Sequence, residues 1–353
     1  MSSGLNHLWK RGAEFLGSEY AIMGGAMTWV SEANLVSGIS NAGGFGVLAC
    51  GSMPPALLEK EIRATAAKTA NPFGVNLIIM HSELGSLIDT CIDNKVSHIV
   101  LAGGLPKSVT ISRIKNAGIK VICFAPSYPI GKKLVKAGAD ALVIEGMEAG
   151  GHIGPVSTSV LAQEILPEMT REMPEIPVFV AGGIGRGEAM VSYLEMGASG
   201  CQLGTRFVCA NESIAHPSFK RAFLKASARD AVPSVQIDPE FPVIPVRALA
   251  NRASTEFILL QRKTIEDYRA GKLDKQAAQL QIEHFWAGAL RRAVVEGDIE
   301  NGSLMAGQSV GMVTKEQSVK EIIEELVFQA EDYLRARKTA GAGNLKIAEK
   351  IGG

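Results

Sequence analysis

The chain has 353 residues, of which 46% are aliphatic, aromatic or cysteine, so it can bury a large core. Its 36 Lys and Arg balance its 36 Asp and Glu, which excludes the basic surface that nucleic acids or anionic membranes attract. The five cysteines lack C-x-x-C spacing, and the sequence shows neither a signal peptide nor an 18-residue apolar run. We therefore expect a cytoplasmic protein with reduced thiols that binds no nucleic acid and no membrane.

Eight short apolar runs follow one another along the first 205 residues, each bounded by turn residues. Their near-continuous apolarity is typical of parallel strands that are buried on both faces. The runs cover residues 20–27, 45–50, 73–80, 98–103, 120–125, 141–146, 177–183 and 200–205. Segments with helical periodicity separate them, so the pattern predicts an α/β fold, a closed (β/α)8 TIM barrel. The alternative is a doubly wound sheet, but the sequence has no G-x-G-x-x-G motif after its first predicted strand to support it.

The composition changes after the eighth run. Residues 210–310 contain a Pro-rich irregular stretch and then charged helical sequence, which predicts a mostly helical cap that shapes the substrate site. An amphipathic helix within residues 311–338 is expected to pack on the barrel. The expected order is therefore an N-terminal extension (1–18), the barrel (19–209), the cap, this helix and a loose tail (339–353).

Glycines gather where the seventh and eighth predicted strands end. Gly182 and Gly183 end the seventh run, and Gly204 and Thr205 end the eighth. The carboxyl ends of the strands carry the active site in this fold, and exposed backbone N–H groups beside helix N-termini bind phosphate. One such loop would be an ordinary tight turn, whereas two in adjacent units predict a phosphate site.

One histidine, His152, lies among glycines in "EGMEAGGHIG", residues 145–154. It is either a surface histidine in a turn, or a ring that faces a large flat ligand pressed against bare backbone. Glu148 is likewise either a second catalytic carboxylate or a solvated loop charge. The other histidines have no partners at metal-ligand spacing, so no metal site is predicted.

Six segments resemble, in order, the signatures of the nitronate monooxygenase and enoyl-acyl carrier protein reductase II family. They are "SNAGGFGVL", "NPFGVNL", "EGMEAGGHIGP", "VAGGIGRGEAM", "LGTRFVCANES" and "GSLMAGQSVGMV". The resemblance runs from about residue 20 to residue 335. It implies an FMN-dependent TIM-barrel oxidoreductase whose flavin lies at the barrel mouth, with His152 as the catalytic residue facing flavin and substrate.

The resemblance also implies the contacts of the cofactor. The residues expected to hold FMN are Met23, Gly24, Gly25, Asn76, Glu145, Gly150, Gly151, Gly182, Gly183, Gln202, Leu203, Gly204 and Thr205. Met305 and Phe285 are candidates for lining the substrate pocket, with core packing as the alternative for both. A bound monovalent cation and a homodimer are both compatible with the sequence.

Three features resemble the reductase branch: "EGMEAGGHIG", "GSLMAGQ" and "VRALANRAS". They favour NAD(P)H-dependent reduction of an enoyl thioester, presented as a small molecule or on an acyl carrier protein. The alternative is a nitronate monooxygenase that oxidises alkyl nitronates with O₂. His152 serves as a proton donor in the first reaction and as a base in the second. A flavin-free barrel that binds a sugar or nucleotide phosphate, as an isomerase or binding module, would need the phosphate loops but not Asn76.

Overall fold

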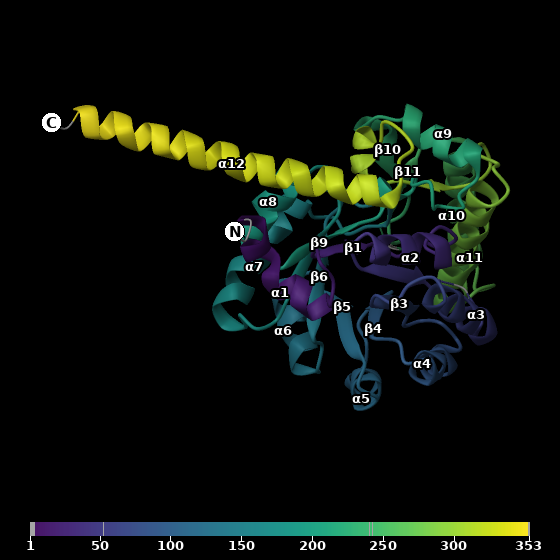
Figure 1. Cartoon of the computed structure of the whole chain (residues 1–353). Helices are drawn as coiled ribbons and strands as arrows, with labels where there is room; N and C mark the ends of the chain where they lie inside the picture. Colours follow the sequence, from purple (N-terminus) through teal and green to yellow (C-terminus); the bar gives the residue numbers. More distant parts are fainter. Residues whose placement is uncertain (1–3, 52, 240, 242, 352–353) are drawn as a thin grey trace.

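The computed structural model describes residues 4–351 apart from residues 52, 240 and 242. Eight parallel strands form one sheet in the order β1-β9-β8-β6-β5-β4-β3-β2, with helices packed around it (Figure 1). The strands are β1 (Ile22–Gly24), β2 (Gly46–Ala49), β3 (Phe73–Ile78), β4 (His98–Ala102), β5 (Lys120–Phe124), β6 (Ala141–Glu145), β8 (Val178–Ala181) and β9 (Gly200–Leu203). Each lies inside one of the eight apolar runs, so the predicted TIM barrel is confirmed.

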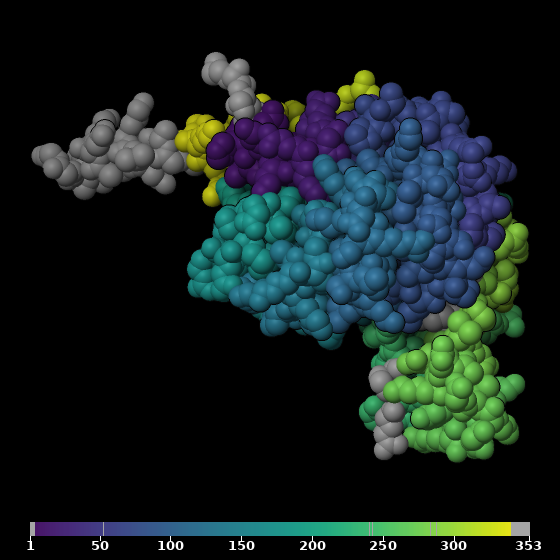
Figure 2. Space-filling model, turned by 90° about the horizontal axis from the view of Figure 1, so that it is seen from below, coloured from purple at the N-terminus to yellow at the C-terminus, as the bar shows by residue number. Residues whose placement is uncertain are grey.

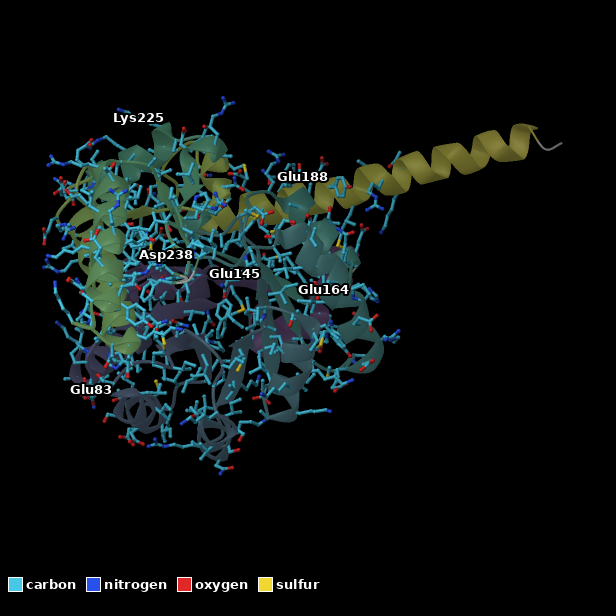
Figure 3. The ribbon with its side chains drawn as sticks, turned by 180° about the vertical axis from the view of Figure 1, so that it is seen from behind. Glu83, Glu145, Glu164, Glu188, Lys225 and Asp238 are labelled. Atoms are coloured by element: carbon cyan, nitrogen blue, oxygen red, sulfur yellow. The ribbon has the colours of Figure 1, made fainter. Side chains whose placement is uncertain are left out.

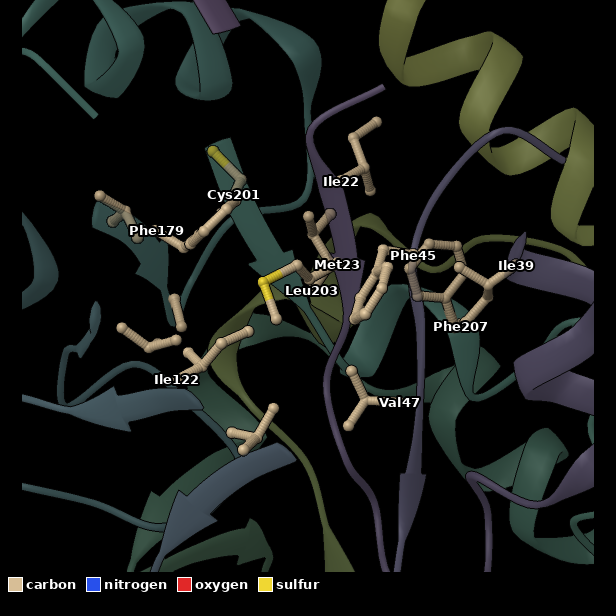
Figure 4. Close-up of a cluster of buried hydrophobic side chains, with 14 of the residues drawn as sticks. Ile22, Met23, Ile39, Phe45, Val47, Ile122, Phe179, Cys201, Leu203 and Phe207 are labelled. Carbon is tan, nitrogen blue, oxygen red and sulfur yellow. The ribbon is translucent and has the colours of Figure 1, made fainter. Parts of the chain in front are cut away.

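The sheet closes between its first and second strands. Met23 and Phe45 form an isolated parallel bridge, in which Gly24 N donates to Phe45 O (2.9 Å) and Phe45 N donates to Ile22 O (2.9 Å). The interior is filled by apolar side chains rather than by a channel, and Figure 4 shows Met23 there beside Phe45 and Leu203. A packed interior leaves the ends of the barrel as the places where a ligand can bind.

Helices connect the strands and begin or end where the sequence predicts. Pro55 is the first residue of α3, as expected for a helix start, and Gly197, just past α8, adopts a left-handed φ of 109°. The connecting helices are α2 (Ala33–Asn41), α3 (Pro55–Ala66), α4 (Leu84–Asp93), α5 (Ser108–Asn116), α6 (Tyr128–Lys136), α7 (Thr158–Glu172) and α8 (Gly187–Glu195).

The N-terminal helix α1 (Gly4–Leu16) covers the end of the barrel at which the strands begin. Gly12 lets the helix approach the residue before β9, because a Cβ at this position would lie 2.0 Å from Ser199 O. Phe15 packs edge-on against the ring of His98, with 5.2 Å between the ring centroids. Trp9 is 1% exposed. The helix therefore acts as an apolar plug on this end.

The segment after β9 holds helices and a small antiparallel sheet. Strand β11 (Val246–Leu249) pairs with β10 (Ala231–Pro233), with β12 (Leu304–Met305) and with β7 (Gly151–His152), which comes from the loop after β6. The helices are α9 (Pro217–Lys225), α10 (Arg252–Arg269) and α11 (Lys275–Val294). Figure 2 shows the green part of this segment as a lobe beside the barrel body. Helical periodicity did not indicate the sheet, because its strands are two to four residues long.

The last helix, α12 (Val319–Ile351), packs its first turns against α8, α1 and α2. Ile322, Ile323 and Leu326 on this helix are buried. The tail expected to be loose from residue 339 is helical as far as Ile351, and the strong helix formers of the segment "NLKIAEK" favour this. No helix in the described part of the chain combines the length and apolarity that a membrane crossing requires.

Candidate functional site

The loop after β6 carries His152 to the mouth of the barrel, at the carboxyl ends of the strands. Gly151 and His152 form the short strand β7, with Gly151 opposite Arg247 and His152 opposite Val246 of the cap strand β11. Ile153 N donates to Pro245 O (2.9 Å) and extends this pairing. The side chain of His152 is exposed although its backbone is paired, so the ring is presented at the mouth.

Glu145, the last residue of β6, is electrostatically coupled to His152. Burial raises the pKa of the Glu145 carboxyl to about 7, and attraction to His152 opposes that rise. Figure 3 locates Glu145 near the centre of the molecule, away from the surface carboxylates such as Glu164 and Glu188. A carboxyl group with this pKa exchanges protons near neutral pH, which suits a general acid or base.

Three of the glycines near His152 differ in how closely the rest of the chain packs against them. A Cβ on Gly150 would lie 2.6 Å from Gly307 N, and one on Gly146 would lie 2.0 Å from Thr158 Oγ1. Gly154, in contrast, has no neighbour within 4 Å of such an atom. At Gly146 and Gly150 the chain itself makes a close approach that accounts for glycine, and the interpretation that these glycines admit a flat ligand stays a prediction.

The loops after β8 and β9 form the glycine-rich part of the mouth. Gly182 and Gly183 have left-handed φ values of 97° and 71°, which turn successive peptide groups around one concave bend. Gly204 follows β9, and a Cβ on it would meet only the Met27 side chain, at 3.4 Å. Thr205 Oγ1 accepts from Gly307 N (2.9 Å) and ties this loop to the segment after β12.

Asn76, Gln202 and Leu203 contribute the strand ends beneath these loops. Asn76 is 7% exposed, and its Nδ2 donates to Val100 O (3.2 Å), which fixes the amide orientation at the end of β3. Gln202 is 8% exposed, and Leu203 is buried in the core. These residues lie on the same rim as Glu145, because all are at or next to the carboxyl ends of parallel strands.

The segment after β1 was expected to touch the flavin through Met23, Gly24 and Gly25. Met23 is fully buried with its side chain in the barrel core, so only its backbone is available to a ligand. Gly24 faces Ile39, whose Cδ1 would lie 2.6 Å from an added Cβ. Gly25 N donates to Leu203 O (2.8 Å), which joins this segment to the end of β9.

Glu148 caps the N-terminus of α7 rather than being a solvated loop charge. Its Oε2 accepts from the backbone N (2.8 Å) and the Oγ1 (2.9 Å) of Thr158, the first residue of that helix. A carboxylate here satisfies the unpaired amides and the positive end of the helix dipole. The α7 terminus is thus already occupied by an anionic group, and a ligand phosphate would have to bind elsewhere.

Met305 and Phe285, the two candidates for the substrate pocket, both pack against the apolar cluster of the cap, but Met305 also packs against the barrel core. Met305 is on β12, and its Sδ would lie 3.6 Å from a Cβ on Gly151, so it adjoins the loop of His152. Phe285 packs in the aromatic cluster of the cap, 5.5 Å from Phe257 and 5.3 Å from Trp286 between ring centroids. The geometry thus favours Met305 over Phe285 as a pocket residue, and both remain predictions.

Two residues at the mouth were missed by the sequence analysis. Arg247 is 2% exposed and donates from Nε to Met147 O (2.8 Å), in the loop that carries His152. Trp29, in the loop after β1, has a left-handed φ of 67°. The Arg291 guanidinium lies over the Trp29 ring, with Cζ 5.9 Å from the ring centroid. A bulky residue in that backbone region is strained, a feature that clusters at functional sites. The "VRALANRAS" segment was the signal for Arg247; no sequence pattern marks Trp29.

The cysteines and possible metal ligands lie apart from this chemistry. All five cysteines are buried and free, and burial raises the pKa of Cys50, Cys123, Cys201 and Cys209 to about 12, which keeps these thiols protonated. Within the described residues, no three His, Cys, Asp or Glu side chains gather as a metal site.

The model of one protein family, described as nitronate monooxygenase, matches residues 10–87 and 85–329. The chain belongs to the nitronate monooxygenase family. The family match, together with the relatives below, makes it an oxidoreductase of a group that is flavin-dependent in general.

Relatives within this family have several names. A Mycobacterium tuberculosis protein is 31% identical over 91% of this chain and 96% of its own; it is named (3aS,4S,5R,7aS)-5-hydroxy-7a-methyl-1-oxo-octahydro-1H-indene-4-carboxyl-CoA dehydrogenase. A probable nitronate monooxygenase of Staphylococcus saprophyticus is 27% identical over 90% of this chain and 97% of its own. The solved structure of FabK from Thermotoga maritima superposes with a TM-score of 0.80, at 36% identity, and covers 94% of this chain and 98% of that one. The resemblance inferred from the sequence motifs is thereby confirmed at the level of the family.

Proposed function

We propose that the protein binds FMN at the barrel mouth and reduces enoyl thioesters with NAD(P)H as the reductant. The observation that carries this proposal is the coupled pair of His152 and Glu145 on the same rim as the glycine loops after β8 and β9. A carboxyl group with a pKa raised to about 7 next to an exposed imidazole, beside backbone able to hold a phosphate, matches what a flavin-dependent reduction requires of its protein.

The residues of the rim fit the phosphate of FMN. Backbone N–H groups on a bend of left-handed glycines are donors for a dianion, and Gly182, Gly183, Gly204 and Thr205 belong to adjacent loops. The α7 terminus is excluded because Glu148 occupies it. Asn76, Gln202, Gly25 and Glu145 would then lie nearest the rest of the cofactor.

The chain's own part in the reaction is the movement of a proton. FMN, when bound, would supply the hydride that the β-carbon of the enoyl group requires, and the α-carbon would need a proton from the protein. His152 is exposed at the mouth and is the group we assign as donor to that carbon. We assign Glu145, with a pKa raised to about 7, as the group that returns a proton to the imidazole after turnover.

The names of two relatives support a thioester as the substrate class. Relatives from Mycobacterium tuberculosis and Rhodococcus jostii, 31% and 30% identical to this chain, are both named as carboxyl-CoA dehydrogenases. FabK, the solved relative at 36% identity, is a structural neighbour over nearly the whole chain. The acyl group would reach the site as a small-molecule thioester or on an acyl carrier protein.

Oxidation of alkyl nitronates is the second candidate. It is supported by the family model and by the Staphylococcus relatives, which are 27–28% identical and are named probable nitronate monooxygenases. In that reaction His152 would act as a base toward a neutral nitroalkane.

The cofactor assignment is tested by Gly204→Val. An added side chain meets only the flexible Met27 within the chain, so the fold should tolerate it, whereas it would obstruct a phosphate between the β8 and β9 loops. We expect the purified variant to lose its flavin while its circular dichroism stays unchanged. Gly154→Ala, at an open position, is the control and should stay yellow. Full FMN occupancy in Gly204→Val would overturn the assignment.

The substrate assignment is tested by assaying the holoenzyme anaerobically with NADH or NADPH and crotonyl-CoA, and aerobically with propyl-2-nitronate. We expect saturable reduction of crotonyl-CoA and slower oxidation of the nitronate. Nitronate oxidation without any thioester reduction would reject the reductase and establish the second candidate.

A further inference from the structure

Arg247 is a buried cation in the cap that contacts the catalytic loop of the barrel. It lies in the middle of β11 opposite Gly151, and its side chain is 2% exposed. Burial lowers the pKa of its guanidinium, and the negative charge of Glu148 opposes that lowering. The group stays charged, because an arginine has a pKa above 12 in its ordinary state.

The guanidinium joins two main-chain oxygens from different parts of the molecule. Its Nε donates to Met147 O (2.8 Å), and its Nη1 donates to Ala231 O at the start of β10. Met147 N in turn donates to Val156 O (2.8 Å), which closes the base of the loop. The Met147 residue is therefore held through both its N–H and its C=O, and the C=O is held by the cap.

The loop between Met147 and Val156 has little stiffness of its own. It contains Gly150, Gly151 and Gly154, and its only regular element is the two-residue strand β7. Glycine has more conformational freedom than any other residue, and so short a strand is marginal without support. The position of the His152 ring therefore depends on contacts made to the loop from outside.

We propose that Arg247 is a positioning residue: it fixes the loop that carries His152 from the cap strand, so that the imidazole points at the substrate. The inference rests on the proposed role of His152. Arg247 does not touch the reacting atoms; it acts through Met147 and through the pairing of β11 with β7.

The choice of arginine suits this task better than a space-filling role. A buried charge is unfavourable unless it is fully bonded, and an apolar side chain of similar volume would fill the same space. Such a replacement would leave the oxygens of Met147 and Ala231 buried and unpaired. The planar guanidinium holds two acceptors in fixed directions, whereas the single ammonium of lysine fixes neither as firmly.

The test compares Arg247→Met and Arg247→Lys with Arg252→Met as the matched control. Arg252 lies on the adjacent helix α10, and its side chain is 72% exposed in an ion pair with Glu256. The flavin of each purified holoenzyme is reduced anaerobically, and its reoxidation is followed with crotonyl-CoA or with ferricyanide, which needs no proton donor. Amide hydrogen exchange of residues 147–154 is measured on the same samples.

We expect Arg247→Met to slow reoxidation by crotonyl-CoA about 10–100-fold, the usual range for a group that orients another. The apparent Kd for crotonyl-CoA and the rate with ferricyanide should stay at the parent values, and residues 147–154 should exchange faster. Arg247→Lys should recover part of the rate, and it replaces the methionine variant if that one fails to fold.

Two outcomes separate this inference from the function on which it rests. If His152→Ala slows the thioester reaction but both Arg247 variants behave like Arg252→Met, Arg247 is not a positioning residue. If His152→Ala has no effect, the proposed function fails instead. Support also requires that Arg247→Met causes no further loss in the His152→Ala background, because both would then remove the same step.

Discussion

Each end of the barrel holds a histidine, and the two rings differ in exposure and in their surroundings. His98 opens β4 at the plugged end and is 2% exposed, with ring nitrogens 2.9 Å from Ser97 Oγ and 3.1 Å from Phe15 O. Burial lowers the pKa of His98 to about 4. His152, at the open end, is exposed and adjoins Glu145, whose pKa burial raises to about 7.

This contrast separates the stabilising end from the reactive end. Around His98 the aromatic rings of Phe15 and Phe45 pack on the imidazole, and its two nitrogens bond to Ser97 Oγ and Phe15 O, so the ring stays neutral and serves packing. Around His152 the backbone is glycine-rich and is held by residues of the cap, and the side chain is exposed at the mouth. In TIM barrels the same division is general, with chemistry at the carboxyl ends of the strands.

The largest stability effect is expected at the plugged end. Trp9→Ala removes a side chain that is 1% exposed and should lower the free energy of unfolding by about 3–5 kcal/mol. Urea unfolding of the holoenzyme measures this change. The control is Phe328→Ala on α12, where the side chain is 63% exposed and the expected change is under about 0.5 kcal/mol. Equal effects of the two substitutions would mean that α1 is not a plug.

His98 should make stability depend on acid. The folded pKa of about 4 lies below the ordinary value of 6.5, so the unfolded chain binds a proton that the folded chain does not. Stability should therefore fall by about 3 kcal/mol as the pH drops from 6.5 to 4. Unfolding of His98→Gln over this range should lack that decline, while His284→Gln, at an exposed position, should keep it.

Glu145 should change the free energy of unfolding with pH in the direction opposite to His98. Its folded pKa of about 7 lies above the ordinary 4.5, so the stability of its neutral form is present below pH 4.5 and is lost as the pH rises through 7. Although burial raises this pKa, the residue keeps some contact with solvent, which screens the charge, so Glu145→Gln should raise the free energy of unfolding at pH 8 by about 1 kcal/mol. The pH dependence of unfolding between pH 5 and 8 measures this, and a variant that is less stable at pH 8 would contradict it.

The smallest expected effect is at Gly154, in contrast to Gly150 of the same loop. Gly154→Ala should change the free energy of unfolding by less than about 0.5 kcal/mol, because the added methyl meets nothing within 4 Å. Gly150→Ala should destabilise by about 1–3 kcal/mol, because its methyl would overlap Gly307 N. If thermal unfolding shows similar changes for both, close packing against the segment after β12 does not explain Gly150.

The barrel could be predicted because each of its strands has a local signature in the sequence. A parallel strand buried on both faces is a short apolar run between turn residues, and eight such runs were enough to give the fold. The small sheet of β7, β10, β11 and β12 has no such signature. Its strands are two to four residues long, and their pairing is set by tertiary contacts.

The site could be predicted only where it depends on glycine spacing and family motifs. His152, Asn76 and the glycines after β8 and β9 were predicted in this way, and their roles remain predictions. The contact of Arg247 with Met147 joins residues 100 positions apart, so no local pattern reports it. The capping role of Glu148 and the burial of Met23 likewise depend on which side chains meet in space.

The central claim is that His152 takes part in the reaction and His98 in packing. One rate tests this claim most directly. Holoenzyme is reduced anaerobically and mixed with crotonyl-CoA, and flavin reoxidation is followed for the parent, His152→Ala and His98→Gln. We predict that His152→Ala slows this step about 10²–10⁴-fold with an unchanged unfolding midpoint, whereas His98→Gln lowers the midpoint and keeps the parent rate. Reoxidation of His152→Ala at the parent rate would contradict the claim and leave His152 as a surface residue of a turn.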